Sequence, residues 1–245
     1  MSRARLRFYA ELNDFLPIEH RFREFERSFG TGTTVKDLIE STGVPHTEVE
    51  LVLVNGRSIG FSYTVRDGER ISVYPTFESF DVSPALKVRD EPLRRTRFVL
   101  DVHLGKLARH LRLLGFDTLY EQDRSDPELA EISAGEQRIL LTRDLGLLKR
   151  RIITHGYYVR ESDPRAQLAE VVARLDLTRR IQPFTRCLNC NGELEPVDKK
   201  EVADRLEART RRHFEEFWIC RECKNIYWKG SHYDKLLELV ASVRS

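Results

Sequence analysis

The chain has 245 residues and balances 41 Lys and Arg against 39 Asp and Glu, which leaves a net charge of +2. Its hydrophobic fraction of 40% is sufficient for packed cores, and the length allows one large domain or two to three smaller ones. The apolar stretches are far shorter than a membrane span and no apolar signal region opens the chain, so we exclude a membrane protein and expect a cytoplasmic one.

Residues 1–80 are predicted to form a β-grasp domain. Alternating apolar residues indicate extended segments, Thr34 is a good N-cap for a helix, and Asn55-Gly56 is a strong hairpin signal. The expected order is strand, strand, helix, strand, an optional further strand, and a last strand. The predicted elements are strands at residues 6–8, 20–25, 49–54 and 70–74 and a helix from Thr34 to Gly43.

This first segment resembles the ubiquitin-like sulfur carriers of thiamine and molybdopterin synthesis, through the Asn-Gly turn and the run DGERISVYP at residues 67–75. Those carriers end in a free Gly-Gly tail, which is their chemical handle. Here Tyr74-Pro75 continues into more chain with no such tail, so carrier chemistry is not expected. A module that docks a protein partner and a packing module without a partner both stay open.

Residues 81–96 contain Pro84 and Pro92 and are predicted to be a linker. From Arg97 to about residue 180, strand and helix patterns alternate. Repeated units of this kind are typical of a doubly wound parallel sheet. Strands are expected at residues 97–100, 118–120, 139–141 and 157–159, and helices begin near residues 104, 125, 145 and 163.

Two of these apolar strands run into an aspartate, Asp101 and Asp144. Ligands of open α/β sheets bind at the carboxyl ends of the strands, and Asp126 begins a helix that can face the same edge. Several carboxylates gather in one crevice only around a cation or a shared proton. The sequence therefore predicts that Asp101, Asp126 and Asp144 bind one or two Mg²⁺ or Mn²⁺ ions, which prefer oxygen ligands and can activate water.

The simpler alternative is that these aspartates only cap helices. Asp126 precedes Pro127, Asp144 precedes the helix near residue 145, and Asp101 precedes the helix near residue 104. Two of the three follow buried strands directly, which favours the metal site. Among weaker candidates, Asp163 is expected to cap a helix, Asp117 and Asp123 to be solvated, and His103 to lie on the surface or in packing, with substrate contact left open.

The four cysteines form two pairs, Cys187-x-x-Cys190 and Cys220-x-x-Cys223, separated by the 29 residues 191–219. In a chain with no secretion signal this spacing is typical of a zinc ribbon, in which four thiolates close a structural site. Redox thiols or two local disulfides are the alternatives. We predict that all four cysteines bind one zinc ion, and that a helix at residues 233–243 closes the segment 181–245.

Basic residues gather in four places along the chain. Such clusters are candidate phosphate contacts, although any one of them can be a solvated helix face. Together they favour a nucleic-acid partner for the acidic site. The clusters are Arg94–Arg97, Lys149–Arg151, Arg179–Arg180 and Arg205–Arg212.

Longer motifs resemble the PIN-like ribonuclease domain of the Mut-seven C-terminal family. They are FVLDVHLGKLARHLRLLGFDTLY at residues 98–120, SDPELAEI at 125–132 and RILLTRDLGLLKRR at 138–151. The ribbon resembles the family through RCLNCNGELEPV and FWICRECKNIYWKGSHYDKLL, as does the ubiquitin-like segment that often precedes it in bacteria. The resemblance covers nearly the whole chain.

The resemblance implies a PIN fold and metal-dependent cleavage of RNA. It assigns the metal to Asp101, Asp126 and Asp144 and suggests phosphate contacts for Lys106 and Arg109, and for Arg143 next to Asp144. His103 departs from the apolar or acidic residue expected at that position. Fold alone does not fix activity across PIN-like domains.

Our hypothesis is a cytoplasmic ribonuclease with a β-grasp domain at 1–80, a linker at 81–96, a PIN-like domain at 97–180 and a zinc ribbon at 181–245 that helps to bind RNA. One rival is a non-catalytic RNA-binding protein with a degenerate PIN fold. Another is an adaptor whose ubiquitin-like domain docks a protein partner. A flap-cleaving DNA nuclease ranks lower because the chain lacks a large helical arch.

Overall fold

The computed structural model describes residues 1–75 and 96–244, so the predicted linker lies, apart from Thr96, outside the described residues. The described residues form two compact units, 1–75 with 126–158 and 96–125 with 159–244. Among the described residues no helix has the length and apolar character needed to cross a membrane.

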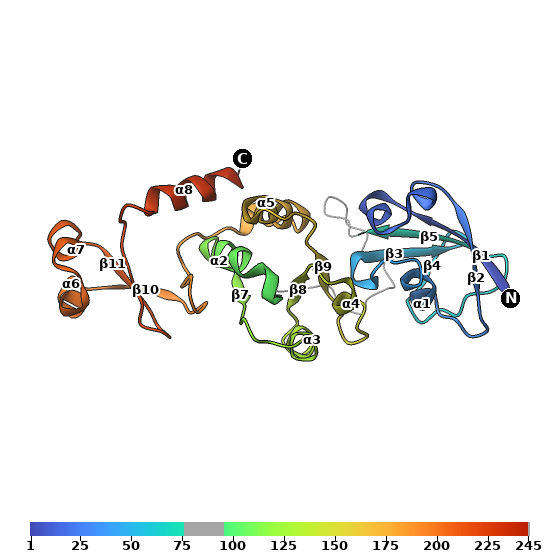
Figure 1. The fold of residues 1–245 in the computed structure, drawn as a ribbon, viewed down its shortest axis with the longest axis horizontal. Helices are drawn as coiled ribbons and strands as arrows, with labels where there is room; N and C mark the ends of the chain where they lie inside the picture. The colour runs from blue at the N-terminus through green and yellow to red at the C-terminus, as the bar shows by residue number, and fades with distance from the viewer. Residues whose placement is uncertain (76–95, 245) are drawn as a thin grey trace. The chain divides into compact units, whose positions relative to one another are not determined.

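The first unit begins with a five-stranded mixed sheet of order β2-β1-β5-β3-β4 (Figure 1). Strands β1 and β5 run parallel, and the other pairs are antiparallel. This is the predicted β-grasp. Its elements are β1 (Ser2–Phe8), β2 (Phe25–Phe29), α1 (Val35–Glu40), β3 (Val49–Val54), β4 (Arg57–Ser58) and β5 (Arg70–Pro75).

The core of this sheet follows from the alternation in its strands. Leu6 and Phe8 of β1 are buried against the apolar side of α1, whose Leu38 and Ile39 are fully buried. The helix begins as predicted, because Thr34 and Asp37 form a reciprocal capping box that satisfies two backbone N–H groups.

The strand predicted at residues 20–25 is wrong, because it begins only at Phe25 and continues to Phe29. The side chain of Asn13, which is 1% exposed, shapes the loop that precedes it. Its amide group donates to two nearby backbone carbonyls, and its carbonyl oxygen accepts from the N–H of Phe22 at 2.7 Å. Phe22 has a φ of +58°, which an extended strand excludes.

The second part of the first unit has alternating helices and strands, as predicted. Its elements are α3 (Asp126–Gly135), β8 (Ile139–Thr142), α4 (Leu145–Leu148) and β9 (Gly156–Tyr158). Strands β8 and β9 are parallel, and every residue of β8 is buried. Helix α4 begins where predicted and ends at Leu148, where the chain turns so that the N–H of Ile153 donates to the carbonyl of Arg150.

A buried histidine connects the β-grasp to this second part. Nδ1 of His46 lies 2.6 Å from a carboxylate oxygen of Glu40, and Nε2 lies 2.8 Å from the carbonyl oxygen of Ile153. The carbonyl oxygen can only accept, so Nε2 carries the hydrogen that it donates to Ile153. Nearby, the backbone N–H of Tyr158 donates to the carboxylate of Glu48.

The second unit also contains alternating strands and helices. Strands β6 and β7 pair in parallel, with Phe98 opposite Thr118. The elements are β6 (Arg97–Leu100), a 3₁₀ turn (Val102–Leu104), α2 (Gly105–Leu113), β7 (Asp117–Leu119) and α5 (Pro164–Arg174). Gly115 follows the end of α2 at a φ of +92°, where a Cβ would lie 2.1 Å from the carbonyl oxygen of Gln182.

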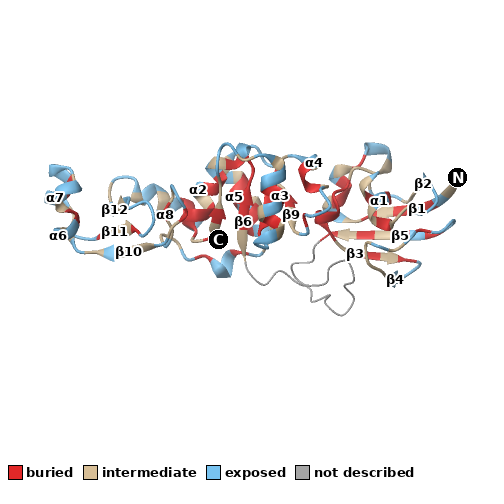
Figure 2. Cartoon of the chain, turned by 90° about the horizontal axis from the view of Figure 1, so that it is seen from below, coloured by how far each residue is buried: buried red, intermediate tan, exposed pale blue. Residues whose placement is uncertain are grey.

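The remainder of the second unit is a ribbon of order β10-β11-β12, followed by the predicted C-terminal helix. Figure 2 shows mostly exposed and intermediate residues in the ribbon, whereas α2 and α5 carry buried faces. The elements are β10 (Leu194–Val197), α6 (Lys199–Val202), α7 (Ala208–His213), β11 (Phe217–Cys220), β12 (Ile226–Tyr227) and α8 (Tyr233–Ser242).

Replacing His46 by Ala should loosen the contact between the β-grasp and the segment around Ile153, because two groups lose their hydrogen-bond partner in a buried place. We expect faster hydrogen–deuterium exchange of residues 145–158 and a loss of about 1–3 kcal/mol of stability. The exposed His213, changed to Ala, is the matched control and should leave exchange unaltered. Equal protection in both variants would contradict this role of His46.

Candidate metal centre and nucleic-acid interface

The four cysteines converge in the second unit, as the spacing predicts. All are reduced, and their sulfur atoms lie within 4.8 Å of one another. The Sγ atoms are 3.6 Å apart for Cys187 and Cys223 and 3.4 Å apart for Cys190 and Cys220. A tetrahedral zinc with Zn–S bonds of ~2.3 Å needs sulfur separations of about 3.8 Å. The four residues therefore fit one structural zinc ion.

The two halves of this centre have the same local geometry. In each, the N–H four residues after the first cysteine donates to that cysteine's carbonyl, Asn191 to Cys187 and Lys224 to Cys220. Both donors adopt a left-handed backbone conformation, with φ of +75° and +59°. Such turns place the two cysteines of a pair on the same side of the loop, where both can hold one ion.

Hydrogen bonds favour a thiolate at Cys187. Burial raises the pKa of this thiol, but the hydroxyl of Tyr227 at 3.0 Å and the backbone N–H groups of residues 189 and 190 outweigh it and lower the pKa to about 7. Burial instead raises the pKa of Cys223 to about 12. A cation at the centre would favour the thiolate at every position, since metal ligation requires it.

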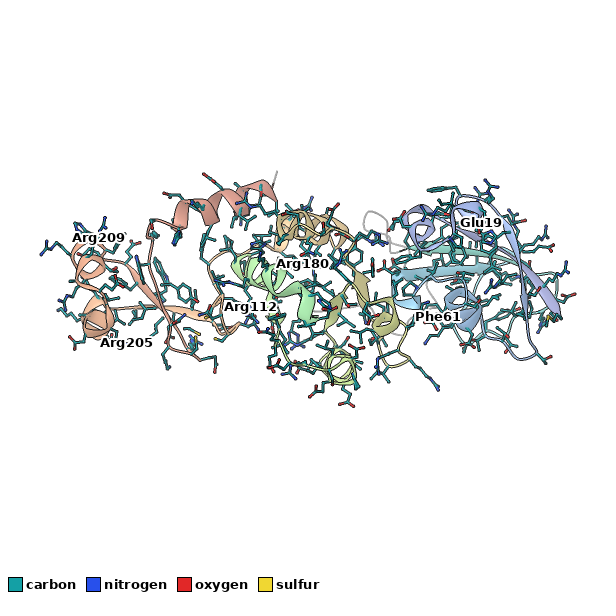
Figure 3. The ribbon with its side chains drawn as sticks, in the orientation of Figure 1. Glu19, Phe61, Arg112, Arg180, Arg205 and Arg209 are labelled. Carbon is teal, nitrogen blue, oxygen red and sulfur yellow. The ribbon has the colours of Figure 1, made fainter. Side chains whose placement is uncertain are left out.

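A buried arginine joins the first cysteine pair to α2 and β7 (Figure 3). The side chain of Arg112 is 3% exposed, and burial lowers its pKa. Its guanidinium donates to the carbonyls of Thr118 at 2.9 Å, Leu188 at 3.2 Å and Asn189 at 2.6 Å. Three backbone acceptors from two segments are therefore satisfied by a single cation.

Asn191 adds a second connection between the same segments. Its side-chain oxygen accepts from the N–H of Thr118, and its amide donates to a carboxylate oxygen of Asp117, each at 2.8 Å. Asp117 was expected to be solvated, and this is wrong, because it is half-buried in this pair. The exposed Asp123 agrees with the prediction.

Next to the first cysteine pair lies a basic pocket of about 810 Å³. Lys106 and Arg109, predicted to contact phosphate, are exposed and share this pocket with His103. No Asp or Glu appears among the described residues that line it. The pocket is lined by His103, Gly105, Lys106, Arg109, Arg112, Tyr120, Ser162, Pro164, Gln167, Leu188 and Asn189.

Two of the predicted metal-binding acids also cap helical turns. The carboxylate of Asp101, which is 4% exposed, accepts from the N–H of His103 at 2.7 Å. The exposed Asp144 accepts from the N–H groups of Gly146 at 2.6 Å and Leu147 at 3.4 Å. Both aspartates thus cap the turn that follows them, and this fixes both carboxylates at the ends of β6 and β8.

The other predicted residues have simpler surroundings. Asp126 begins α3, and its carboxylate lies 3.9 Å from Arg150 in the same unit. Arg143, next to Asp144, is half-buried. Asp163 caps α5 as expected, and the N–H groups of Ala166 and Arg165 lower its pKa. Within the described residues, the cysteines are the only group of three or more His, Cys, Asp or Glu close enough together to hold one ion.

Sequence reasoning missed Arg112, Asn191 and the aromatic residues of the ribbon. Arg112 follows Lys106 and Arg109 at helical spacing, and the three basic residues look alike in sequence. The two cysteine pairs form the same turn, and Asn191 follows the first pair as Lys224 follows the second. This repetition was a usable signal for Asn191.

Changing Cys223 to Ser should remove zinc and disorder the ribbon, because structural zinc contributes roughly 10–16 kcal/mol of apparent binding energy in small zinc domains. Elemental analysis should give one zinc per wild-type chain and none for the variant. Tyr227→Phe, which removes the hydroxyl near Cys187 but no ligand, should retain its zinc. Freshly purified wild-type protein without zinc would contradict the assignment.

Changing Arg112 to Met should lower the free energy of unfolding of the second unit by about 2–4 kcal/mol, since three buried carbonyls lose a charged donor. Urea denaturation and the rate of zinc release to a chelator would measure the effect. Arg109→Met on the exposed side of the same helix is the control and should change stability by less than about 0.5 kcal/mol. Equal stability of the two variants would refute the role of Arg112.

Comparison with known proteins gives few individual relatives. No curated protein gives a significant match. A solved structure from Pyrococcus furiosus, named as molybdopterin converting factor, subunit 1, aligns with 31% of this chain and 100% of its own length, at 20% identity. Its TM-score is 0.26, and we draw nothing from it.

Family models are more informative than single relatives. The Mut7-C ubiquitin domain matches residues 1–81, where the structure has its β-grasp. The Mut7-C RNAse domain matches residues 96–240, more than half of the chain, and includes the parallel strands, the basic pocket and the cysteine centre. The chain therefore belongs to the Mut7-C RNAse domain family and carries the Mut7-C ubiquitin domain ahead of it.

Proposed function

We propose that this protein is a metal-dependent ribonuclease that hydrolyses RNA phosphodiester bonds. The observation that carries the proposal is the family match over residues 96–240, within which Asp101 and Asp144 follow buried parallel strands. These two acids and Asp126 are proposed to bind Mg²⁺ or Mn²⁺.

Each acid is suited to this task in its own unit. Asp101 and Asp144 accept backbone N–H groups of the following turn, so their carboxylates are held in place at the ends of β6 and β8. Asp126, near Arg150, supplies a third carboxylate. A bound Mg²⁺ or Mn²⁺ supplies a nucleophilic water and offsets the charge that develops on the phosphodiester.

The basic pocket supports an RNA substrate. Lys106 and Arg109 are proposed to contact phosphates, and Arg143 to act in the same way next to Asp144. The zinc ribbon is proposed to have a structural role and to help bind RNA. The ubiquitin-like domain is proposed to dock a protein partner, and the protein to act in the cytoplasm.

Asp144→Asn and Asp101→Asn should each reduce RNA cleavage by at least about 100-fold, equivalent to ~2.7 kcal/mol of transition-state stabilisation. The fold should persist, because Asn is also a good N-cap. Cleavage of a labelled RNA in the presence of Mn²⁺ would be measured.

Asp198→Asn is a matched control for this experiment. Asp198 is exposed and caps α6, a helix of four residues like α4, by accepting the N–H of Lys200. This variant makes the same change of charge and cap and should cleave at the wild-type rate. Undiminished cleavage by Asp144→Asn would refute the proposed site.

The experiment must also distinguish the ribonuclease from a non-catalytic RNA-binding protein. In that case RNA binds without product at any Mg²⁺ or Mn²⁺ concentration, and binding survives EDTA. Because EDTA also removes zinc from a ribbon, a sample with zinc alone restored is required. Cleavage that returns with Mn²⁺ but not with zinc supports the ribonuclease.

A further inference from the structure

An aromatic groove of about 510 Å³ lies in the second unit, between the ribbon and the start of α8. Trp218, Tyr227 and Trp228 line one part of it, and Phe184 and Tyr233 line another. The rings of Phe184 and Tyr233 are 4.8 Å apart between centroids and support each other. The groove is within the volume range of ligand sites, and its walls are mainly apolar and aromatic.

Trp228 is the most exposed of these rings, with 38% of its surface accessible. Its ring packs against those of Phe214 and Phe217, each 6.5 Å away between centroids. A Cβ at Gly230 would lie 2.7 Å from the indole nitrogen, so the absence of a side chain there lets the backbone lie against the indole. The indole is therefore held in place while much of it stays accessible from the groove.

The charge around the groove has one sign. Arg109, Arg186 and Lys229 line it, and no Asp or Glu appears among the described residues that do so. The ammonium group of Lys229 lies 5.4 Å from the centroid of Trp218, although it is also paired with Glu216 outside the groove. Aromatic faces beside cations are the combination that binds unpaired nucleic-acid bases and their phosphates.

The groove adjoins the basic pocket, since Arg109 and Leu188 line both. One strand could therefore place a base in the groove and its neighbouring phosphates in the pocket beside Lys106. A protein partner would need acidic groups to match both regions, whereas every nucleotide carries an anionic phosphate and an aromatic base. Charge complementarity therefore favours a nucleic acid.

We propose that this groove binds an unpaired base of single-stranded RNA by stacking on Trp228, with adjacent phosphates of the strand in the basic pocket. The proposal rests on the proposed function only for the choice of RNA. Bases inside a duplex are stacked on each other and cannot enter such a groove. The groove thus gives the protein a preference for single-stranded substrate.

The test is the binding of a fluorescein-labelled ten-nucleotide oligouridylate, followed by anisotropy in an Asp144→Asn background that should preserve the RNA. Trp228→Ala should weaken binding by at least about fivefold, the lower end for loss of one stacked base. Trp228→Phe keeps an aromatic face and should stay within about threefold of the parent.

Leu237→Ala is the matched control, because Leu237 is similarly exposed, at 41%, and lies on α8 outside the groove. It should bind the oligonucleotide like the parent. A double-stranded RNA of the same length should bind the Trp228→Ala variant and the parent equally. Zinc content is measured for every variant, so that a misfolded ribbon is recognised.

Two results would overturn the proposal that the groove binds an unpaired base. One is oligouridylate binding that is unchanged in zinc-loaded Trp228→Ala. The other is a loss of duplex binding in this variant that equals its loss of oligouridylate binding. The first would also be the result if the groove docks a protein instead. These outcomes are separable from failure of the ribonuclease. If the protein never cleaves RNA but Trp228→Ala weakens single-strand binding, the groove proposal stands. If the protein cleaves RNA normally and Trp228 is not needed, the groove proposal fails.

Discussion

The second unit depends on the hydrogen bonds that the guanidinium of Arg112 donates. It leaves α2 and donates to the carbonyl of β7 at Thr118 and to those of Leu188 and Asn189 in the first cysteine loop. A charge buried to this extent is tolerated only when its donors are satisfied. Through it, the position of the metal centre is tied to the helix that presents Lys106 and Arg109. Residues of that junction line both the basic pocket and the aromatic groove, so the geometry of the junction determines the shape of both.

In this protein the positions of the charged residues matter more than the net charge. Acidic and basic residues are nearly equal in number over the chain, yet the described linings of the pocket and the groove contain no acid. Carboxylates instead begin helices, at Asp101, Asp144 and Asp163, where backbone N–H groups hold them. A field of one sign over a concave surface attracts a polyanion even when the whole chain is almost neutral.

Sequence reasoning succeeded where a pattern has one physical cause. Two cysteine pairs at metal-ligand spacing predicted one cluster, and the apolar runs before Asp101 and Asp144 predicted buried strands. It failed where the structure is determined by a contact between residues that are far apart in the sequence. Arg112 looks like its exposed neighbours until the carbonyls 76 and 77 residues away are known. The strand at Phe25 starts late because buried Asn13 holds the loop before it, and no local propensity records such a contact.

The ribbon strands β10 and β11 pair from Leu194 opposite Cys220 to Val197 opposite Phe217, just beyond the cysteine centre. The residues 198–216 between them, with α6, α7 and the labelled Arg205 and Arg209 (Figure 3), form a loop whose two ends are already fixed. Closing such a loop costs only about 0.6 kcal/mol more for each doubling of its length. The length of this loop can therefore change at little cost in stability to the cysteine centre at its base.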